Sequence, residues 1–225
     1  MEKNTAIIFD MDDTLYKERD YRLSGFRTVA RHFASACGLS PARLYDLMLK
    51  EPDIAFENIH DLAATRGLNV PVDLQIAVYR THYPDIELDS ETKHTLTELR
   101  NRGYRLGAIT DGRMFGQLNK ISALQLEAFL DPDLIVPTVL YNTDKHSRRP
   151  FEMVEDLLPK GTRLVYVGDN PEKDFRHPNA MAWHTIMLVD VDHINRHHQD
   201  LRKFDDEYLP QSTVNNISDL LKIFK

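Results

Sequence analysis

Short, continuous runs of apolar and β-rich residues occur four times in the chain, and each run stops abruptly at polar residues. The runs are residues 5–9, 104–109, 163–167 and 183–189. A strand that is buried on both faces of a parallel sheet has this pattern. We therefore predict four parallel strands whose C-terminal ends carry polar side chains.

Segments with helical apolar spacing separate these strands. They are residues 90–102, which Gly103 closes, and residues 114–124 and 150–158. Alternating strands and helices of these lengths predict an α/β fold, with a parallel sheet and helices on both faces. Ligands of such sheets bind at the C-terminal ends of the strands, so the polar residues stand where a site is expected.

The chain between residues 16 and 88 has a different pattern. Its apolar residues are spaced as in helices over residues 26–39, 42–50, 59–68 and 74–83. Prolines and glycines break these segments, and no strand pattern is present. We predict an all-helical domain over residues 16–88, inserted into a core made of residues 1–15 and 89–225. The amphipathic stretch 217–224 is expected to be a helix that docks on that core.

Composition narrows the class of protein. The chain has 225 residues, of which 42% are hydrophobic, enough for a globular protein with a sizeable core. Its 28 Lys and Arg against 35 Asp and Glu give a net charge of -7, which argues against a protein whose main role is binding nucleic acid or an anionic membrane. Cys37 is the only cysteine, so neither a disulfide scaffold nor a thiolate zinc site is available. No apolar run suits a signal peptide or a membrane span, and we expect a soluble, cytoplasmic protein.

The first predicted strand runs directly into Asp10-Met11-Asp12-Asp13-Thr14. Residues two apart on a chain leaving a strand can point into one crevice, which places the carboxylates of Asp10 and Asp12 side by side. One of the pair can remain ionised as a nucleophile or metal ligand, while the other holds a proton as a general acid and base. An acidic turn after a strand is the alternative interpretation of this motif taken alone.

A second acidic cluster, Gly168-Asp169-Asn170-Pro171-Glu172-Lys173-Asp174, follows the third predicted strand. Its carboxylates are the hard oxygen ligands that Mg²⁺ requires. Adjacent strands would bring Asp169 and Asp174 to the Asp10 cluster, and so many carboxylates in one crevice are costly unless a cation neutralises them.

The second predicted strand ends at Thr110-Asp111-Gly112, which offers a hydroxyl and backbone N–H groups to an anion. A phosphoryl group among so many acids also needs a positive charge. Lys145, in a loop before a predicted helix, is the leading candidate, and Arg148 and Arg149 are the others.

In this order and spacing, the four motifs resemble those of the haloacid dehalogenase superfamily of phosphohydrolases. The motifs are Asp10-x-Asp12-x-Thr14, Thr110-Asp111-Gly112, Lys145 and Gly168-Asp169 with Asp174. The resemblance covers nearly the whole chain and implies a Rossmann-like, doubly wound core. It also implies that the helical insertion is a cap of the first class.

The resemblance further implies a role for each motif. Asp10 would attack phosphorus and form an aspartyl phosphate, and Asp12 would protonate the leaving oxygen and then activate water. Thr110 would bind the phosphoryl oxygens together with the backbone that follows it, and Lys145 would stabilise the nucleophile. Mg²⁺ would be held by the Asp10 carboxylate, the Asp12 backbone carbonyl and Asp169, with Asp174 supporting the metal shell. Asp111, Gly112 and Arg149 are the remaining candidates for phosphate binding.

The third and first motifs depart from the usual pattern of the superfamily. Many relatives have Lys-Pro-x-Pro-x-x-Phe where this chain has Lys145 followed six residues later by Phe151, with both prolines of that pattern missing. An alternative register would promote Arg149, which directly precedes Pro150. Asp13 stands where relatives often have glycine.

We expect a Mg²⁺-dependent phosphatase, monomeric or homodimeric, that acts on a sugar phosphate or nucleotide and not on nucleic acid or membranes. A phosphomutase of the same superfamily is the main alternative, and a non-catalytic binding module is an alternative of another class. Dehalogenation needs neither Asp12 nor a metal site, so the acidic residues argue against it.

Charged and aromatic residues near the first motif are candidate substrate contacts or ordinary surface: Lys17, Arg19, Tyr21, Arg22, Phe26. Three histidines form a small cluster in the C-terminal part: His193, His197 and His198. No partner ligand at a suitable spacing accompanies them, which argues against a transition-metal site.

Overall fold

The structure is a computed structural model and describes residues 4–195, 197 and 199–225. The chain forms two compact units. The first, the α/β unit, consists of residues 1–19 and 87–225, and the second, the helical unit, consists of residues 20–86.

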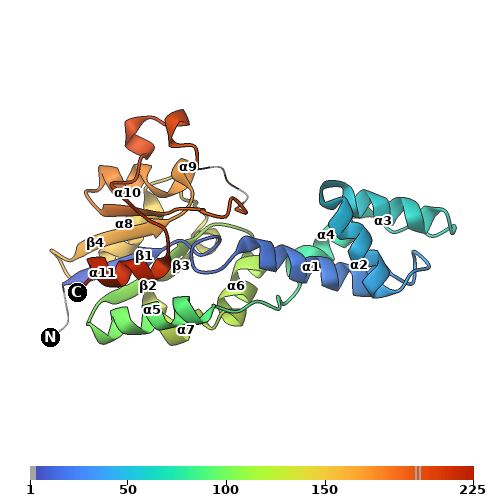
Figure 1. Cartoon of the computed structure of the whole chain (residues 1–225), viewed down its shortest axis with the longest axis horizontal. Helices are drawn as coiled ribbons and strands as arrows, with labels where there is room; N and C mark the ends of the chain where they lie inside the picture. The colour runs from blue at the N-terminus through green and yellow to red at the C-terminus, as the bar shows by residue number, and fades with distance from the viewer. Residues whose placement is uncertain (1–3, 196, 198) are drawn as a thin grey trace. The chain divides into compact units, whose positions relative to one another are not determined.

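A six-stranded parallel sheet forms the centre of the α/β unit (Figure 1). Its strand order is β3-β2-β1-β4-β5-β6, so the first strand of the chain lies in the middle. The strands are β1 (Thr5–Phe9), β2 (Arg105–Thr110), β3 (Ile135–Pro137), β4 (Arg163–Gly168), β5 (His184–Leu188) and β6 (Ser212–Val214). The four predicted strands and the α/β class are confirmed. The edge strands β3 and β6 were not predicted, because three residues are too few to show a pattern.

Helices cover the sheet on both faces, as predicted (Figure 1). In the order of the chain they are α5 (Ser90–Asn101), α6 (Met114–Ala123), α7 (Leu126–Phe129), α8 (Arg149–Asp156), α9 (Pro171–Asp174), α10 (Arg176–Ala180) and α11 (Leu220–Ile223). The C-terminal segment docks on the core as expected, since α11 packs on α5 and Arg102 donates to the carbonyls of Leu221 and Phe224.

One hydrophobic cluster joins α8 to the sheet. Phe151 of α8 packs with Ile8 of β1 and with Trp183 before β5. The Phe151 ring lies 5.4 Å from that of Tyr166 and 5.7 Å from that of Trp183, both edge to face. This packing fixes the start of α8, and with it the loop that carries Lys145.

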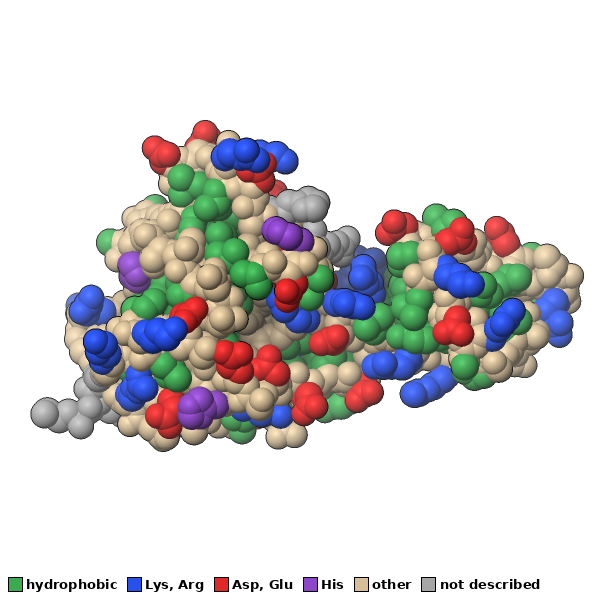
Figure 2. Space-filling model, in the orientation of Figure 1, with side chains coloured by type: hydrophobic (Ala, Val, Ile, Leu, Met, Phe, Trp, Pro, Cys, Tyr) green, Lys and Arg blue, Asp and Glu red, His purple; other side chains and the backbone are tan. Residues whose placement is uncertain are grey.

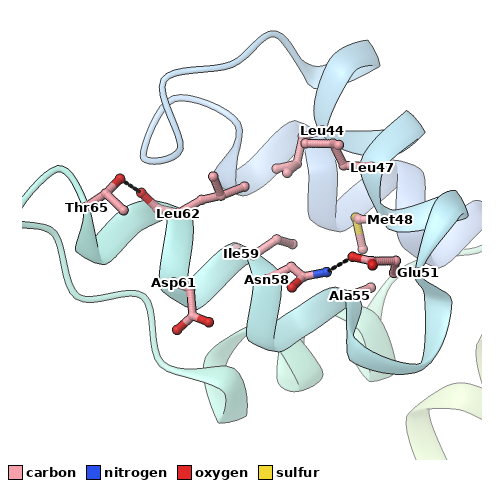
Figure 3. A pocket seen from close by; sticks show the side chains of 10 residues that line it. All are labelled: Leu44, Leu47, Met48, Glu51, Ala55, Asn58, Ile59, Asp61, Leu62 and Thr65. Carbon is pink, nitrogen blue, oxygen red and sulfur yellow. Dashed lines mark hydrogen bonds between the residues drawn. The ribbon is translucent and has the colours of Figure 1, made fainter.

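The helical unit has its own core. Its helices are α1 (Glu18–Phe33, which begins in the α/β unit), α2 (Pro41–Lys50), α3 (Ala55–Ala64) and α4 (Val72–Thr81). Ser40 caps α2 by accepting from the Arg43 N–H, as expected of serine before a helix that starts with proline. A pocket of about 320 Å³ between α2 and α3 is lined mainly by apolar side chains, including Leu44, Met48 and Leu62 (Figure 3).

Acidic and basic side chains are interspersed on the face of each unit that Figure 2 displays. Across the described parts of the chain, no helix combines the length and the apolar character needed to cross a membrane.

Replacement of Phe151 by alanine tests the importance of the α8 cluster. Phe151 is 0% exposed, and Phe→Ala changes in cores cost about 3–5 kcal/mol of unfolding free energy. We expect a loss of this size in urea denaturation. Phe115 is 62% exposed, so Phe115→Ala is the matched control and should change stability little. Equal losses in the two variants would contradict this account of the core.

Candidate active site

The C-terminal ends of three neighbouring strands bring the predicted motifs together. In the order β2-β1-β4, Thr110 ends β2, while Asp10 follows β1 and Asp169 follows β4. A cavity of about 260 Å³ opens at this edge of the sheet. It is lined by Asp10, Asp12, Asp13, Glu18, Asp111, Lys145, Asp169, Asn170, Lys173 and His197.

Lys145 is the buried cation of this cavity. Its side chain is 3% exposed, and its Nζ lies 2.8 Å from Asp10 Oδ1 and 2.6 Å from Asp174 Oδ1. Burial lowers the pKa of the Lys145 ammonium, but the carboxylates of Asp10 and Asp174 more than offset this effect and hold the pKa well above its ordinary value. Lys145 therefore stays charged beside Asp10 at any physiological pH.

Asp174 orients Lys145 and closes the turn after β4. Its Oδ1 accepts from Lys145 and from the Tyr166 hydroxyl, at 3.3 Å, and its Oδ2 accepts from the Asn170 N–H at 2.9 Å. Gly168 makes room for this carboxylate, because a Cβ at residue 168 would lie 2.4 Å from Asp174 Oδ2. Both Asp174 oxygens are thus engaged by the protein itself.

The carboxylates of Asp10 and Asp169 are only partly neutralised by the protein. Burial raises the pKa of Asp10 to about 7, although Lys145 lowers it in part. Burial, with the nearby charges of Asp174 and Asp10, raises the pKa of Asp169 to about 9. Carboxylate oxygens of Asp10, Asp169 and Asp174 lie within 4.8 Å of one another. This group can hold a hard cation, whose charge would offset the repulsion.

Asp12 lines the same cavity and is held by residues that the sequence did not single out. Both of its oxygens accept from Lys120 Nζ at 2.8 Å, and Oδ1 also accepts from the Tyr16 hydroxyl. Nothing in the sequence distinguishes Lys120 from an ordinary lysine of an amphipathic helix. Only the docking of α6 against the sheet places it here.

The Thr110 hydroxyl is also held by α6. It donates to Gln117 Oε1 at 3.1 Å, and Gln117 Nε2 donates to the Asp111 carbonyl at 2.7 Å. Gly112 allows this close approach, since a Cβ there would lie 2.0 Å from Gln117 Nε2. The Asp111 carboxylate faces the protein, where it accepts from the Lys145 N–H and from Thr138. The Asp111 carboxylate therefore orders the Lys145 loop, and the backbone of Asp111 and Gly112 remains the candidate for binding phosphate at the cavity.

The structure does not bring Arg149 to the cavity. Its side chain is 59% exposed at the start of α8 and lies near Glu152 and Asp156. Arg148 is exposed too and pairs with Glu152. Of the three candidate cations, Lys145 alone contacts Asp10, and the alternative register is not the one that this fold adopts.

Asp13 has a structural role at the turn after β1. Its φ of 54° lies in the left-handed region, where glycine, asparagine and aspartate are tolerated best. Its Oδ1 accepts from the Glu18 N–H at 2.9 Å, at the start of α1. Aspartate can therefore replace the glycine of relatives and add a bond to the helix.

The segment after β5 reaches back to Asp169. Asn195 Nδ2 donates to Asp169 Oδ2 at 3.1 Å, and Gln199 Nε2 donates to the Asp169 carbonyl at 2.8 Å. Lys17 donates to Asn195 at 3.3 Å. His197 lines the cavity and His193 is exposed. His198 lies outside the described residues.

Two of the candidate substrate contacts pack inside the helical unit instead. Phe26 belongs to its hydrophobic core. Tyr21 is buried, and its ring packs on those of Tyr79 and His82. These positions were wrongly considered as substrate contacts because helical spacing does not distinguish a core aromatic from one that faces a ligand.

Gly168→Ala tests the role of Asp174. The added methyl group would displace the Asp174 carboxylate and with it Lys145, and a misplacement of about 1 Å at a reacting group can cost roughly 100-fold in rate. We expect a loss of that order in kcat/KM. Gly161→Ala is the control, since it meets no atom within 4 Å and costs only backbone strain from its positive φ. Full activity of Gly168→Ala would contradict the proposed positioning.

The raised pKa of Asp169 predicts a pH dependence of stability in the metal-free protein. The pKa is 3.8 ordinarily and about 9 in the folded chain, so folding favours the protonated acid. Its stabilising contribution is complete below pH 4 and is lost as pH rises towards 9. The free energy of unfolding of the parent, minus that of Asp169→Asn, should therefore fall from pH 5 to pH 9. Urea denaturation in the presence of EDTA measures both values. A constant difference would contradict the assignment.

Comparisons with known proteins bear on this geometry. A sequence model of the haloacid dehalogenase-like hydrolase family matches residues 7–187. The chain is 27% identical over 232 residues to a glyceraldehyde 3-phosphate phosphatase of Methanopyrus kandleri, covering 98% of this chain and 97% of the relative. It is 25% identical over 231 residues to a protein of the same name from Methanocaldococcus jannaschii, covering 98% and 96%.

A solved structure shares the fold. The crystal structure of the HAD-hydrolase YfnB of Bacillus subtilis, bound to magnesium, matches with a TM-score of 0.65 at 15% identity, over 98% of each chain. At this identity the match concerns the fold alone. The family match and the phosphatase relatives confirm the prediction of a phosphatase-type phosphomonoester hydrolase. The chain belongs to the haloacid dehalogenase-like hydrolase family.

Proposed function

We propose that this hydrolase is a Mg²⁺-dependent phosphatase of a small sugar phosphate and that it works through an aspartyl phosphate on Asp10. The contact of Lys145 with Asp10 carries the proposal. A nucleophilic carboxylate needs to be ionised, and a buried ammonium at 2.8 Å favours that form. Asp12 lies on the wall of the same cavity, where its carboxyl group can donate a proton to the leaving oxygen.

The residues carry out two transfers. An Asp10 oxygen attacks phosphorus, the ester P–O bond breaks, and Asp12 gives its proton to the leaving oxygen. Water then loses a proton to Asp12 and attacks the aspartyl phosphate, which releases inorganic phosphate and restores Asp10. Lys145 offsets the negative charge that gathers around phosphorus, the main requirement of phosphoryl transfer.

The donor set fits Mg²⁺. Carboxylate oxygens of Asp10, Asp169 and Asp174 lie within 4.8 Å of one another, and both oxygens of Asp174 already accept hydrogen bonds, from Lys145 and Asn170. We assign Asp10, the Asp12 carbonyl and Asp169 as ligands, with Asp174 as support. When bound, Mg²⁺ supplies positive charge against the phosphoryl oxygens.

The substrate class rests on the relatives. Two phosphatases named for glyceraldehyde 3-phosphate resemble this chain along nearly its full length. A cavity of about 260 Å³ suits a small phosphate ester. We propose a short sugar phosphate as substrate and the helical unit as the cap that contacts its leaving group.

Phosphate release from glyceraldehyde 3-phosphate, other sugar phosphates, mononucleotides and p-nitrophenyl phosphate tests the function. We expect turnover that requires Mg²⁺, is lost with EDTA, and is fastest for short sugar phosphates. Asp10→Asn should lower kcat by at least about 10³-fold, because it removes the nucleophile. The exposed Asp156→Asn is the control and should retain full activity.

Different results would exclude different parts of the proposal. Turnover that survives in Asp10→Asn would show that Asp10 is not the nucleophile. Interconversion of sugar phosphates without net release of phosphate would point to a phosphomutase. Preference for mononucleotides would change the substrate class and leave the chemistry in place.

A further inference from the structure

A second buried lysine, Lys120 of α6, contacts the other reactive aspartate. Its side chain is 5% exposed, and Nζ donates to both oxygens of Asp12 at 2.8 Å. The Tyr16 hydroxyl, on the segment between β1 and α1, donates to Asp12 Oδ1 as well. Asp12 is therefore held from two sides by residues on different segments of the α/β unit.

Stability alone does not account for this pair. Most ion pairs in the described part of the chain are at the surface, such as Lys222 with Asp219. Taking a lysine out of water costs free energy that its partner only partly returns, and apolar residues of similar volume often serve as well. A lysine buried against a half-buried reactive carboxylate suggests that the position of the carboxylate is what matters.

The same face of α6 holds a second group of the site. Gln117, one turn before Lys120, accepts from the Thr110 hydroxyl at 3.1 Å. Both side chains are buried, and residues three apart on a helix lie on one face. One helix thus contacts the proposed proton donor and the hydroxyl proposed to bind phosphate.

We propose that Lys120 is a positioning residue that acts through Asp12, an inference that rests on the proposed phosphatase chemistry. Two bonds from Nζ and one from Tyr16 restrict the side chain of Asp12 to one orientation at the cavity wall. Oδ1 accepts from Lys120 and Tyr16 and Oδ2 accepts from Lys120. Each carboxylate oxygen has two lone pairs, so Oδ2 keeps one with which Asp12 can carry a proton to the leaving group. Without Lys120 the carboxyl group would sample other orientations, and proton transfer to the leaving oxygen would slow.

Leaving groups of different basicity separate this role from a general structural one. The parameter kcat/KM reports the first transfer. Glycerol 3-phosphate releases an alkoxide that needs a proton, whereas p-nitrophenyl phosphate releases a weakly basic phenolate that departs without one. In Lys120→Met we expect kcat/KM to fall by roughly 100-fold for glycerol 3-phosphate, the scale of general acid catalysis, and by less than about threefold for p-nitrophenyl phosphate. Lys120→Arg keeps the positive charge and can still donate to both oxygens of Asp12, so this variant should retain much of the parent's kcat/KM.

A double-mutant cycle tests whether Lys120 acts through Asp12. In an Asp12→Asn background, Lys120→Met should cause no further loss, because the residue it positions no longer carries a proton. Tyr16→Phe removes the second donor and should give a smaller loss with the same dependence on the leaving group. Lys222→Met, which breaks an exposed pair, is the control, and circular dichroism and thermal midpoints verify folding of each variant.

Three outcomes would overturn the role of Lys120: equal losses on both substrates, additive losses in the Asp12→Asn background, or unchanged activity of Lys120→Met. If Lys120→Met does not fold, the two substrates are compared in Tyr16→Phe and Lys120→Arg instead. Equal losses of kcat/KM on both substrates in these variants would overturn the positioning role of Lys120. If Asp10→Asn is as active as the parent, the proposed function itself is contradicted, and the role of Lys120 is contradicted with it.

Discussion

The site depends on one constraint, the shortage of positive charge among crowded carboxylates. Asp10, Asp169 and Asp174 bring their oxygens within 4.8 Å of one another, and Lys145 is the cation that contacts two of them. Removal of a buried charge from such a group leaves its partners unpaired. The surrounding structure therefore serves to fix Lys145: Asp111 binds its backbone, Asp174 its side chain, and the α8 cluster the helix that follows it.

The topology of the sheet explains why these side chains lie close together. Parallel strands deliver their C-terminal residues to one edge, so neighbouring strands in the order β2-β1-β4 place Thr110, Asp10 and Asp169 within one small region. Side chains from α6 then secure two of the reactive groups. The strands set which residues meet, and the helix sets how Asp12 and Thr110 are oriented.

The parts of the molecule that follow from local pattern were predictable, and those that follow from docking were not. Buried strands with polar ends predicted Asp10 and Asp169, and the position of Lys145 relative to the other motifs made it the leading candidate for the cation. The contribution of Lys120 was not visible, because a lysine on an amphipathic helix looks the same whether it faces water or a carboxylate. Edge strands of three residues likewise have too little sequence to form a signal.

The left-handed backbone of Asp13 has a consequence for how such sequences vary. A position with φ of 54° disfavours β-branched side chains on steric grounds, whatever the chemistry next to it. The residue types that fit this position are then limited by backbone geometry, which glycine and aspartate both satisfy. Two sequences that differ here can share the same turn, and sequence groupings drawn from this residue would reflect the shape of that turn as well as the chemistry of the cavity.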